Sequence, residues 1–526
     1  MSPILIATAI GLVAFYVLKW VSRTRSRIAL PPGPPRKPLI GNLGDLPSHT
    51  DKAWEYWLKH KDLYGPISSL TVCGQDIIII NDARIAVDLL EKHSSAHSSR
   101  PHSTLVEMAG WEDILTSVPH GDHFRAIRRA LHQEIGSKVS VARFNQIQEV
   151  EARRFLFRVL NDQKSLVHHI RKEVGAIVLK LGYGYTIEPH KRDPLVDLAD
   201  KAMEEFSFSI LPATWAVDFL PFLKYLPAWL PGAEFKRMTA TFKKTAAAFS
   251  DLPYAFTKHQ MTQPSHVPSF LSHQLEKGIP RPQSLEEKVA KWSAASLYAG
   301  GTDTTVSTMT AWYIAMALFP DVQRKAQEEM DRVTGGNRLP SYQDRENLPY
   351  INAMIKESVR WHSVVPMNVA HVSIQDDSVG EYAIPKGTQI VTNLWAFTHD
   401  PNIYPDPMAF KPERFIDTAT HKAERDPYYY SFGFGRRVCP GRTLADANIY
   451  ITMALSVAAF NISKPVRDGK EVEVKLDPQP GIICHPAPVE LDIKPRNQVI
   501  ERLIRAVETD YPWEKSHAEL LNSLPY

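Results

Sequence analysis

The stretch of sequence that decides the fold is residues 431–441, which read Ser-Phe-Gly-Phe-Gly-Arg-Arg-Val-Cys-Pro-Gly. Its single cysteine, Cys439, lies in a glycine-rich loop directly before a run that predicts an apolar helix. At a helix N-terminus, unpaired N–H groups and the positive end of the helix dipole stabilise a thiolate. Gly433 and Gly435 permit tight backbone geometry and the close approach of a flat ligand. The loop therefore predicts a sulfur presented to a metal, with Arg437 as the cation for a carboxylate of that ligand.

Cys439 is open to two interpretations, because a lone cysteine beside an apolar helix is most often a small buried hydrophobic residue. The spacing Phe-x-x-Gly-x-Arg-x-Cys-x-Gly favours the other interpretation, since it resembles the haem-binding signature of the cytochrome P-450 family. The resemblance implies heme b (iron protoporphyrin IX) with Cys439 as the proximal iron ligand, and a mainly α fold with small β-sheets. A thiolate ligand favours O–O cleavage, so the implied activity is that of a monooxygenase. The implied haem contacts of the loop are Phe432, Gly433, Gly435 and Arg437, and Gly441 completes the match.

A long apolar helix is expected over about 285–318, and residues 299–305 (Ala-Gly-Gly-Thr-Asp-Thr-Thr) interrupt it. Each glycine inside a helix costs about 1 kcal/mol relative to alanine, so the interruption predicts room for a ligand and a distorted hydrogen-bond ladder. A chance kink is the alternative. The stretch resembles the family's oxygen-activation motif, which implies that Asp303 relays protons and that Thr304 is the hydroxyl beside the reacting oxygen.

Two charged motifs resemble a structural network of the same family. Glu357 and Arg360 stand three residues apart, so they share one face of a helix and can pair. Taken alone, they predict an ordinary solvated surface pair. The stretch Phe-Lys-Pro-Glu-Arg-Phe at 410–415 resembles the motif that supplies a second arginine, Arg414. The resemblance implies that these three side chains lock the loop behind the haem.

Two more candidate haem contacts lie outside the cysteine loop. In the family, a Trp-x-x-x-Arg pair binds a haem propionate, and Arg128 matches its arginine. Phe124 replaces the tryptophan, so the indole N–H donor is missing and only a packing role carries over. His371 occupies a place where the family often has another propionate donor, although a surface or core histidine is an equal alternative.

The substrate is expected to be a hydrophobic small molecule, because the implied pocket walls are apolar. In detail the chain resembles fungal members of the O-methylsterigmatocystin oxidoreductase-like group, which act on secondary metabolites and xenobiotics. The implied wall residues are Val106, Ala299, Val365 and Ile482.

The resemblance also implies a source of electrons. A membrane-anchored member of the family without a fused flavin domain is expected to use NADPH indirectly, through an NADPH–cytochrome P-450 reductase. The basic surface around Arg436 and Arg442 is the expected docking patch.

Two other functions remain open. One keeps the haem without using O2, as in an isomerase or dehydratase of the same family, and Asp303 with Thr304 argues against it. The other is a non-catalytic haem- or lipid-binding membrane protein, which has no need of an acid and a hydroxyl beside the iron. Oxygen consumption that depends on a reductase separates all three.

The N-terminus predicts a membrane anchor, since an uncharged apolar run over 4–18 is followed directly by basic residues. We expect a single-pass protein of the endoplasmic reticulum membrane, in contact with the lipid bilayer, with its catalytic domain in the cytosol. The expected division is an anchor at 1–22, a basic and proline-rich hinge at 23–42, the haem-thiolate monooxygenase domain at 43–495 and a C-terminal surface extension at 496–526.

Composition supports a packed globular protein in a reducing compartment. The formal net charge of the 526 residues is +3, which is too small for the basic field of a nucleic-acid-binding protein. The three cysteines are far apart, which argues against disulfides and a thiolate zinc site. Helical patterns dominate 83–365, whereas a hairpin is expected over 67–82 and strands near 369–393 and 480–492.

Overall fold

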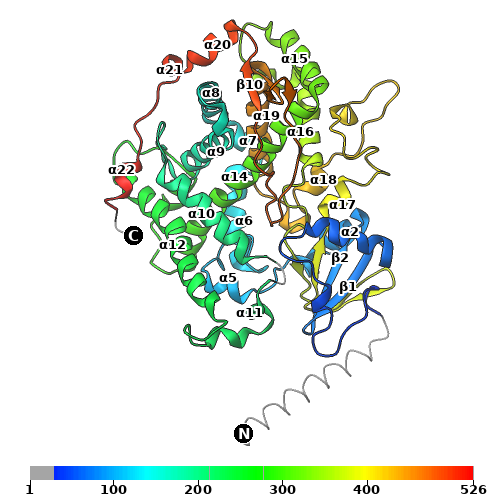
Figure 1. Cartoon of the computed structure of the whole chain (residues 1–526). Coiled ribbons are helices and arrows are strands. Elements are labelled where there is room, and N and C mark those ends of the chain that lie inside the picture. The colour runs from blue at the N-terminus through cyan, green and yellow to red at the C-terminus, as the bar shows by residue number, and fades with distance from the viewer. Residues whose placement is uncertain (1–28, 212–213, 277, 525–526) are drawn as a thin grey trace, which may run out of the picture.

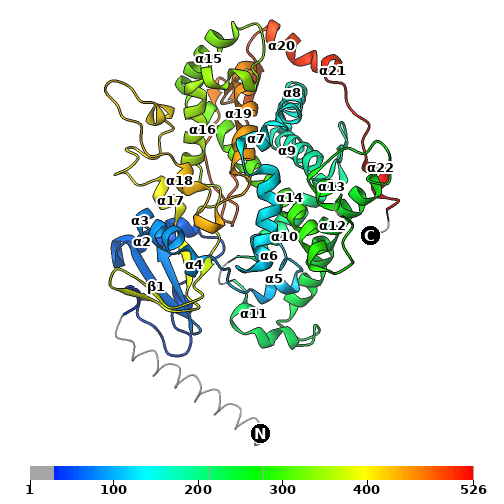
Figure 2. The same ribbon diagram turned by 180° about the vertical axis from the view of Figure 1, so that it is seen from behind.

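The computed structural model describes residues 29–211, 214–276 and 278–524. Figures 1 and 2 show a large helical body beside a smaller part that is built on a β-sheet. The expected class, mainly α with small β-sheets, is confirmed.

Helices make up most of the described chain. The long ones are α2 (Ala53–Tyr64), α6 (Asp122–Ile135), α8 (Asn145–Asn161), α9 (Leu166–Tyr183), α10 (Pro194–Ser209), α12 (Glu234–Gln260), α14 (Leu285–Leu318), α15 (Pro320–Thr334), α16 (Pro349–Trp361) and α19 (Arg442–Ala459). The short ones are α3 (Ala83–Val87), α4 (Ser94–His97), α5 (Thr104–Met108), α7 (Lys138–Ala142), α11 (Ala216–Phe219), α13 (Phe270–Leu275), α17 (Leu394–Thr398), α18 (Tyr428–Ser431), α20 (Gln498–Arg505), α21 (Val507–Asp510) and α22 (Ala518–Leu521).

The main sheet has the strand order β1-β2-β6-β3, formed by β1 (Ile67–Val72), β2 (Gln75–Ile80), β6 (Gln389–Thr392) and β3 (His371–Val372). The expected hairpin is confirmed, since β1 and β2 pair antiparallel around Cys73 and Gly74, whose φ angles are positive. Three two-stranded sheets complete the set: β4 (Asp377–Val379) with β5 (Tyr382–Ile384), β7 (Phe460–Ser463) with β10 (Asp492–Pro495), and β8 (Val466–Arg467) with β9 (Lys470–Glu471).

The strand expected over 480–492 is wrong for most of its length, because only β10, from Asp492 onward, is a strand there. Residues 478–486 form an irregular turn that an isolated bridge between Pro478 and Pro486 closes. Prolines at 478, 480, 486 and 488 remove the backbone donors that a ladder of strand hydrogen bonds requires.

Helix α14 forms the centre of the helical body and packs against α6, α9 and α10 (Figure 1). Its first turn is capped by the Ser284 hydroxyl, which accepts the Glu287 N–H at 3.2 Å. Tyr298, Trp312 and Tyr313 are fully buried, and a helix that is apolar on all sides is expected in a protein core. Because α14 is central, residues 299–305 lie at the middle of the helical body, although Gly300 within them is exposed.

The described part of the expected hinge lies against the sheet. The Ser69 N–H donates to the Pro32 carbonyl at 2.9 Å, and a Cβ added at Gly33 would lie 1.9 Å from the Ser69 carbonyl oxygen. Only glycine therefore fits there. The predicted anchor at 1–22 lies outside the described residues, and none of the helices within them has the length and apolarity to cross a membrane.

Candidate functional site

The cysteine loop has a defined shape that its glycines make possible. The Cys439 N–H donates to the Phe432 carbonyl at 2.8 Å, which closes the loop directly before α19. Gly433 and Gly435 have φ angles of +77° and +50°. A Cβ at Gly435 would lie 2.3 Å from the Leu90 carbonyl oxygen, so this position also requires the absence of a side chain.

The thiol of Cys439 forms no disulfide, and its surroundings act on its pKa in opposite directions. Burial raises its pKa, while backbone N–H groups of Gly441 and Arg442 and the charges of Arg128 and Arg442 act in the opposite direction. A metal cation lowers the pKa of a thiol that coordinates it, so the surroundings suit a metal-bound thiolate.

Arg437 crosses from the cysteine loop to the segments before α6. Its Nε donates to the Ser98 carbonyl at 2.7 Å, and Nη2 donates to the Val118 carbonyl at 2.7 Å. The guanidinium lies 3.8 Å from the centre of the Phe124 ring. Burial lowers the pKa of Arg437 to about 8. Phe124 thus packs under the arginine, which agrees with the packing role expected for it.

Arg100 and His371 line the same interior region, since the positive charge of Arg100 contributes to lowering the pKa of both His371 and Arg437. Arg100 Nη1 donates to the carbonyls of Val369 and Ala370 at 2.7 and 2.8 Å. Burial lowers its pKa to about 9. The His371 ring contacts the His97 carbonyl through Nδ1 at 2.7 Å, and burial lowers its pKa well below the ordinary value. The sequence analysis missed Arg100, because an arginine in an irregular loop carries no pattern of its own.

A third arginine, the partly buried Arg128, reaches the cysteine loop directly, since its Nη1 donates to the Val438 carbonyl at 2.6 Å. Within the described chain, neither Arg100, Arg128 nor Arg437 is paired with a carboxylate. Buried charges without a partner are costly, so these groups match a ligand that brings its own carboxylates. The donor set fits haem, with Cys439 for the iron and the arginines for the propionates. Their contacts with haem, and that of His371, stay predictions.

The predicted oxygen-activation residues lie at the middle of α14. The Thr304 hydroxyl donates to the Gly300 carbonyl at 2.8 Å. Gly300 is exposed although the helix around it is largely buried, and no atom lies within 4 Å of a Cβ added there. Helix α14 is continuous from Leu285 to Leu318, so the glycines do not break it, and the local distortion of its hydrogen-bond ladder stays a prediction. Close packing explains the glycine at position 301, since an added Cβ would lie 2.8 Å from the Val178 side chain of α9.

Asp303 has a partner that the sequence analysis missed. Its Oδ1 lies 2.9 Å from Nε2 of His485, which belongs to the irregular turn near 480. That turn is fastened to α14, because the Ser307 hydroxyl donates to the Cys484 carbonyl at 2.5 Å and His362 Nε2 lies 3.0 Å from the same oxygen. Asp303 and Ser307 are one helical turn apart, so one face of α14 holds the turn at two points.

The predicted structural network is assembled and fully buried. Arg360 Nε donates to Glu357 at 2.7 Å, and Arg414 Nε lies 3.4 Å from the same carboxylate. The Lys411 N–H adds a bond of 2.7 Å to Glu357 Oε1. The alternative of a solvated surface pair is wrong, because Glu357, Arg360 and Arg414 are all shielded from solvent. The network joins α16 to the segment that leads toward the cysteine loop.

The predicted pocket walls come from three regions. Val106 of α5 and Ala299 of α14 are buried in one hydrophobic cluster. Val365 and Ile482 are partly buried in irregular segments, which the hydrogen bond from the Cys484 N–H to the Val364 carbonyl holds together at 2.8 Å. Their role in binding a substrate stays a prediction.

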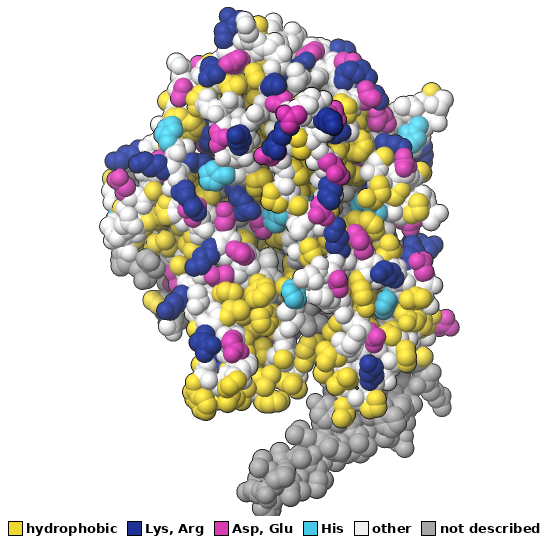
Figure 3. Space-filling model, in the orientation of Figure 1, with side chains coloured by type: hydrophobic (Ala, Val, Ile, Leu, Met, Phe, Trp, Pro, Cys, Tyr) yellow, Lys and Arg dark blue, Asp and Glu magenta, His cyan; other side chains and the backbone are white. Residues whose placement is uncertain are grey.

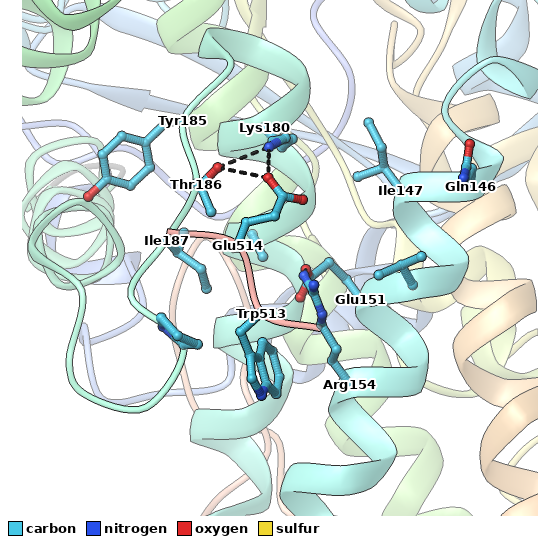
Figure 4. A pocket seen from close by; sticks show the side chains of 13 residues that line it. Gln146, Ile147, Glu151, Arg154, Lys180, Tyr185, Thr186, Ile187, Trp513 and Glu514 are labelled. Atoms are coloured by element: carbon cyan, nitrogen blue, oxygen red, sulfur yellow. Dashed lines mark hydrogen bonds and ion pairs between the residues drawn. The ribbon is translucent and has the colours of Figure 1, made fainter. Parts of the chain in front are cut away.

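A cavity of about 230 Å³ lies elsewhere, between α8, α9 and the C-terminal extension (Figure 4). Glu514 of the extension accepts a 2.5 Å bond from Lys180, and the Arg154 guanidinium lies 4.7 Å from the centre of the Trp513 ring. None of the predicted site residues lines this cavity. The extension therefore closes a groove that is separate from the cysteine loop.

Comparisons with known proteins agree with the geometry of the cysteine loop. The family model described as Cytochrome P450 matches residues 31–493. The chain is 49% identical to "Cytochrome P450 monooxygenase ppsD" of Aspergillus oryzae, over 99% of each chain. It is 41% identical to "Multifunctional cytochrome P450 monooxygenase af510" of Aspergillus fumigatus and 40% identical to "O-methylsterigmatocystin oxidoreductase" of Aspergillus flavus, over 98% of this chain and 97% of each relative.

The match covers the cysteine loop, α14 and the buried Glu357 network in one continuous stretch. The resemblance drawn from Cys439 and its neighbours is thereby confirmed over nearly the whole chain. The protein belongs to the cytochrome P450 family and is a monooxygenase of that family.

Proposed function

We propose that this protein inserts one oxygen atom from O2 into a hydrophobic small molecule, using electrons that an NADPH-dependent reductase delivers. The observation that carries the proposal is that the Cys439 thiol lies in the same region as three buried or partly buried arginines that have no carboxylate partner within the described chain. Such a set suits a ligand that carries both a metal and two carboxylates.

Haem, when bound, supplies the iron centre at which O2 is activated. Cys439 would hold the iron, and Arg100, Arg128 and Arg437 would hold the propionates. The Asp303 carboxyl and the Thr304 hydroxyl would supply protons to the reacting oxygen, with His485 holding Asp303 Oδ1 in place.

The proposed substrate is a secondary metabolite or xenobiotic without essential charge. Val106 and Ala299 present apolar surface, which binds apolar molecules and excludes water. Similarity to an O-methylsterigmatocystin oxidoreductase supports a substrate of this kind.

The proposed partner is NADPH–cytochrome P-450 reductase. Arg436 and Arg442 flank Cys439 in sequence and are both exposed. Exposed cations that surround a redox centre suit an acidic partner surface, because complementary charge steers association.

We further propose a single-pass anchor at 1–22 in the endoplasmic reticulum membrane, a hinge at 23–42, a cytosolic catalytic domain at 43–495 and the extension at 496–526. Figure 3 shows hydrophobic side chains gathered at the end of the molecule where α11 lies. Phe222, Tyr225 and Trp229 in this region are 62%, 78% and 78% exposed. Aromatic side chains of this kind favour the membrane–water interface. Membrane fractionation of the full chain and of a chain lacking residues 1–22 tests this proposal.

The haem-thiolate proposal is tested by the difference spectrum of the reduced protein with carbon monoxide. We expect the wild type to show a Soret band at about 450 nm and Cys439→Ser to lack it. Cys484→Ser is the matched control and should retain the band. A haem-loaded wild type without the band contradicts thiolate ligation. Oxygen consumption that does not depend on an added reductase contradicts the proposed electron source.

A further inference from the structure

Two histidines and an aspartate converge beside the main sheet. His93 Nδ1 and His97 Nε2 each lie 2.9 Å from the same oxygen, Oδ2 of Asp377. The three atoms all lie within 4.8 Å of one another. His97 belongs to α4, His93 directly precedes this helix, and Asp377 begins β4, so two elements far apart in sequence meet here.

The spacing and the chemistry of these groups are those of a metal site. Histidines four residues apart on a helical turn project to the same side, which is how an H-x-x-x-H pair binds zinc. Two imidazoles and one carboxylate form a ligand set that zinc accepts, with a water molecule in the fourth position.

Exposure divides the site into a fixed part and an open part. The His97 side chain is 0% exposed, whereas Asp377 is 19% and His93 is 43% exposed. An ion can therefore enter from solvent along His93. Burial lowers the pKa of His97, which keeps the ring neutral at pH 7 and able to act as a ligand. Burial acts to raise the pKa of Asp377, but the Ser378 N–H and the two histidines outweigh it, so the carboxylate stays charged.

We propose that His93, His97 and Asp377 bind a zinc ion that bridges α4 and β4. This site does not depend on the monooxygenase proposal. In the metal-free protein the His93 and His97 rings each donate an N–H to Asp377 Oδ2. When zinc binds these two nitrogens, each ring stays neutral because its proton moves to its other nitrogen.

The position of the site gives the ion a structural consequence. The His97 carbonyl contacts the His371 ring, and the neighbouring Ser98 carbonyl accepts the bond from Arg437. The Ile374 N–H also donates to the Ala96 carbonyl at 2.9 Å. An ion that clamps α4 to β4 therefore stiffens the segment that positions two predicted haem contacts.

Zinc chloride titrated into the chelator-treated holoenzyme, followed by calorimetry and elemental analysis, tests the proposal. We expect about one zinc ion per chain in the wild type. His93→Asn and Asp377→Asn should each weaken binding by at least about tenfold, since even outer partners of metal sites contribute about 10–100-fold. His102→Asn is the matched control, because His102 is an exposed histidine 3.5 Å from a single carboxylate of Glu107. Its zinc affinity should equal that of the wild type.

Two outcomes overturn the proposal: a wild type that takes up no zinc, or zinc binding that survives both substitutions unchanged. His93 is the safest position to change because it is half-exposed, and an unaltered carbon monoxide spectrum shows that each variant is folded. Zinc should also raise the thermal unfolding temperature of the wild type and of His102→Asn, but not that of His93→Asn.

Discussion

At the scale of single residues, Asp303 and Gly435 show how one contact determines a role. Asp303 extends from a buried helix, yet its carboxylate orientation depends on His485 from a turn much later in the chain. Position 435 requires glycine, because the Leu90 carbonyl oxygen leaves no room for a side chain there. Each contact gives a prediction.

We expect His485→Ala to increase the hydrogen peroxide formed per NADPH oxidised by several-fold. Without its partner the Asp303 carboxyl is free to rotate, and a hydrogen bond to a charged group contributes about 1.5–3 kcal/mol. His485→Gln should restore part of the coupling, because its amide can donate to the same oxygen. In a protein that already carries Asp303→Asn, His485→Ala should cause little further increase in the hydrogen peroxide formed. Fully additive effects would show that His485 does not act through Asp303.

Gly435→Ala should abolish haem incorporation or lower the unfolding temperature strongly. The added Cβ meets the Leu90 carbonyl oxygen at 2.3 Å, and the φ angle of +50° is also unfavourable for alanine. Gly469→Ala is the control, since its φ of +74° carries the same backbone cost and nothing lies within 4 Å of its Cβ. We expect a cost of about 1–2 kcal/mol there. If the two variants lost the same amount of stability, the contact with the Leu90 carbonyl could not explain the effect at Gly435.

At the scale of elements, α16 is joined to the 398–424 segment by the buried Glu357 network. Arg360 donates to the carbonyls of Thr398 and Ala409 as well as to Glu357. Arg414 donates to the Asp406 carbonyl at 2.7 Å. Irregular backbone is thus held by side-chain donors where no sheet or helix supplies hydrogen bonds.

Arg414→Ala should lower the free energy of unfolding by about 3–5 kcal/mol, because it leaves a buried carboxylate without part of its counter-charge. Arg467→Ala removes an arginine of an exposed ion pair with Glu490 and serves as the control. Exposed pairs contribute about 0–1 kcal/mol, so the control should unfold nearly like the wild type. Denaturant titration of both variants measures the difference, and a small effect at Arg414 would mean that solvent reaches Glu357.

At the scale of the whole molecule, buried histidines connect stability to pH. His362 is completely buried between Ser307 and the Cys484 carbonyl, and burial lowers its pKa to about 4. Burial also lowers the pKa of His169 and His399, to about 4 and about 3. The packed core therefore keeps these rings neutral.

The folded protein should lose stability as the pH falls from about 6.5 toward 4. Unfolded histidine takes up a proton near pH 6.5, whereas folded His362 does so only near pH 4, so acid favours the unfolded state in that window. Each pH unit corresponds to about 1.4 kcal/mol for one such group. His362→Gln keeps a hydrogen-bond donor and should flatten the decline in part. The urea midpoints of the wild type and of His362→Gln at pH 7 and pH 5 measure this loss of stability. If both proteins lose the same stability between the two pH values, His362 is not the group responsible.

The sequence by itself determined the features that rest on local patterns. The cysteine loop, the helix over 285–318, the hairpin around Cys73 and the Glu357 motif were all predictable from residue type and spacing. The reason is that glycine conformation, helix periodicity and turn chemistry act between residues that are close in the chain.

The tertiary structure alone decided which distant groups meet. Arg100 joins the cations near Cys439, His485 reaches Asp303, and Asp377 meets His97, although no local pattern marks any of these partners. The burial that excludes a surface role for Glu357 is likewise a property of the packed molecule. Such contacts depend on how whole elements pack, because packing brings residues hundreds of positions apart within hydrogen-bond distance and removes them from water.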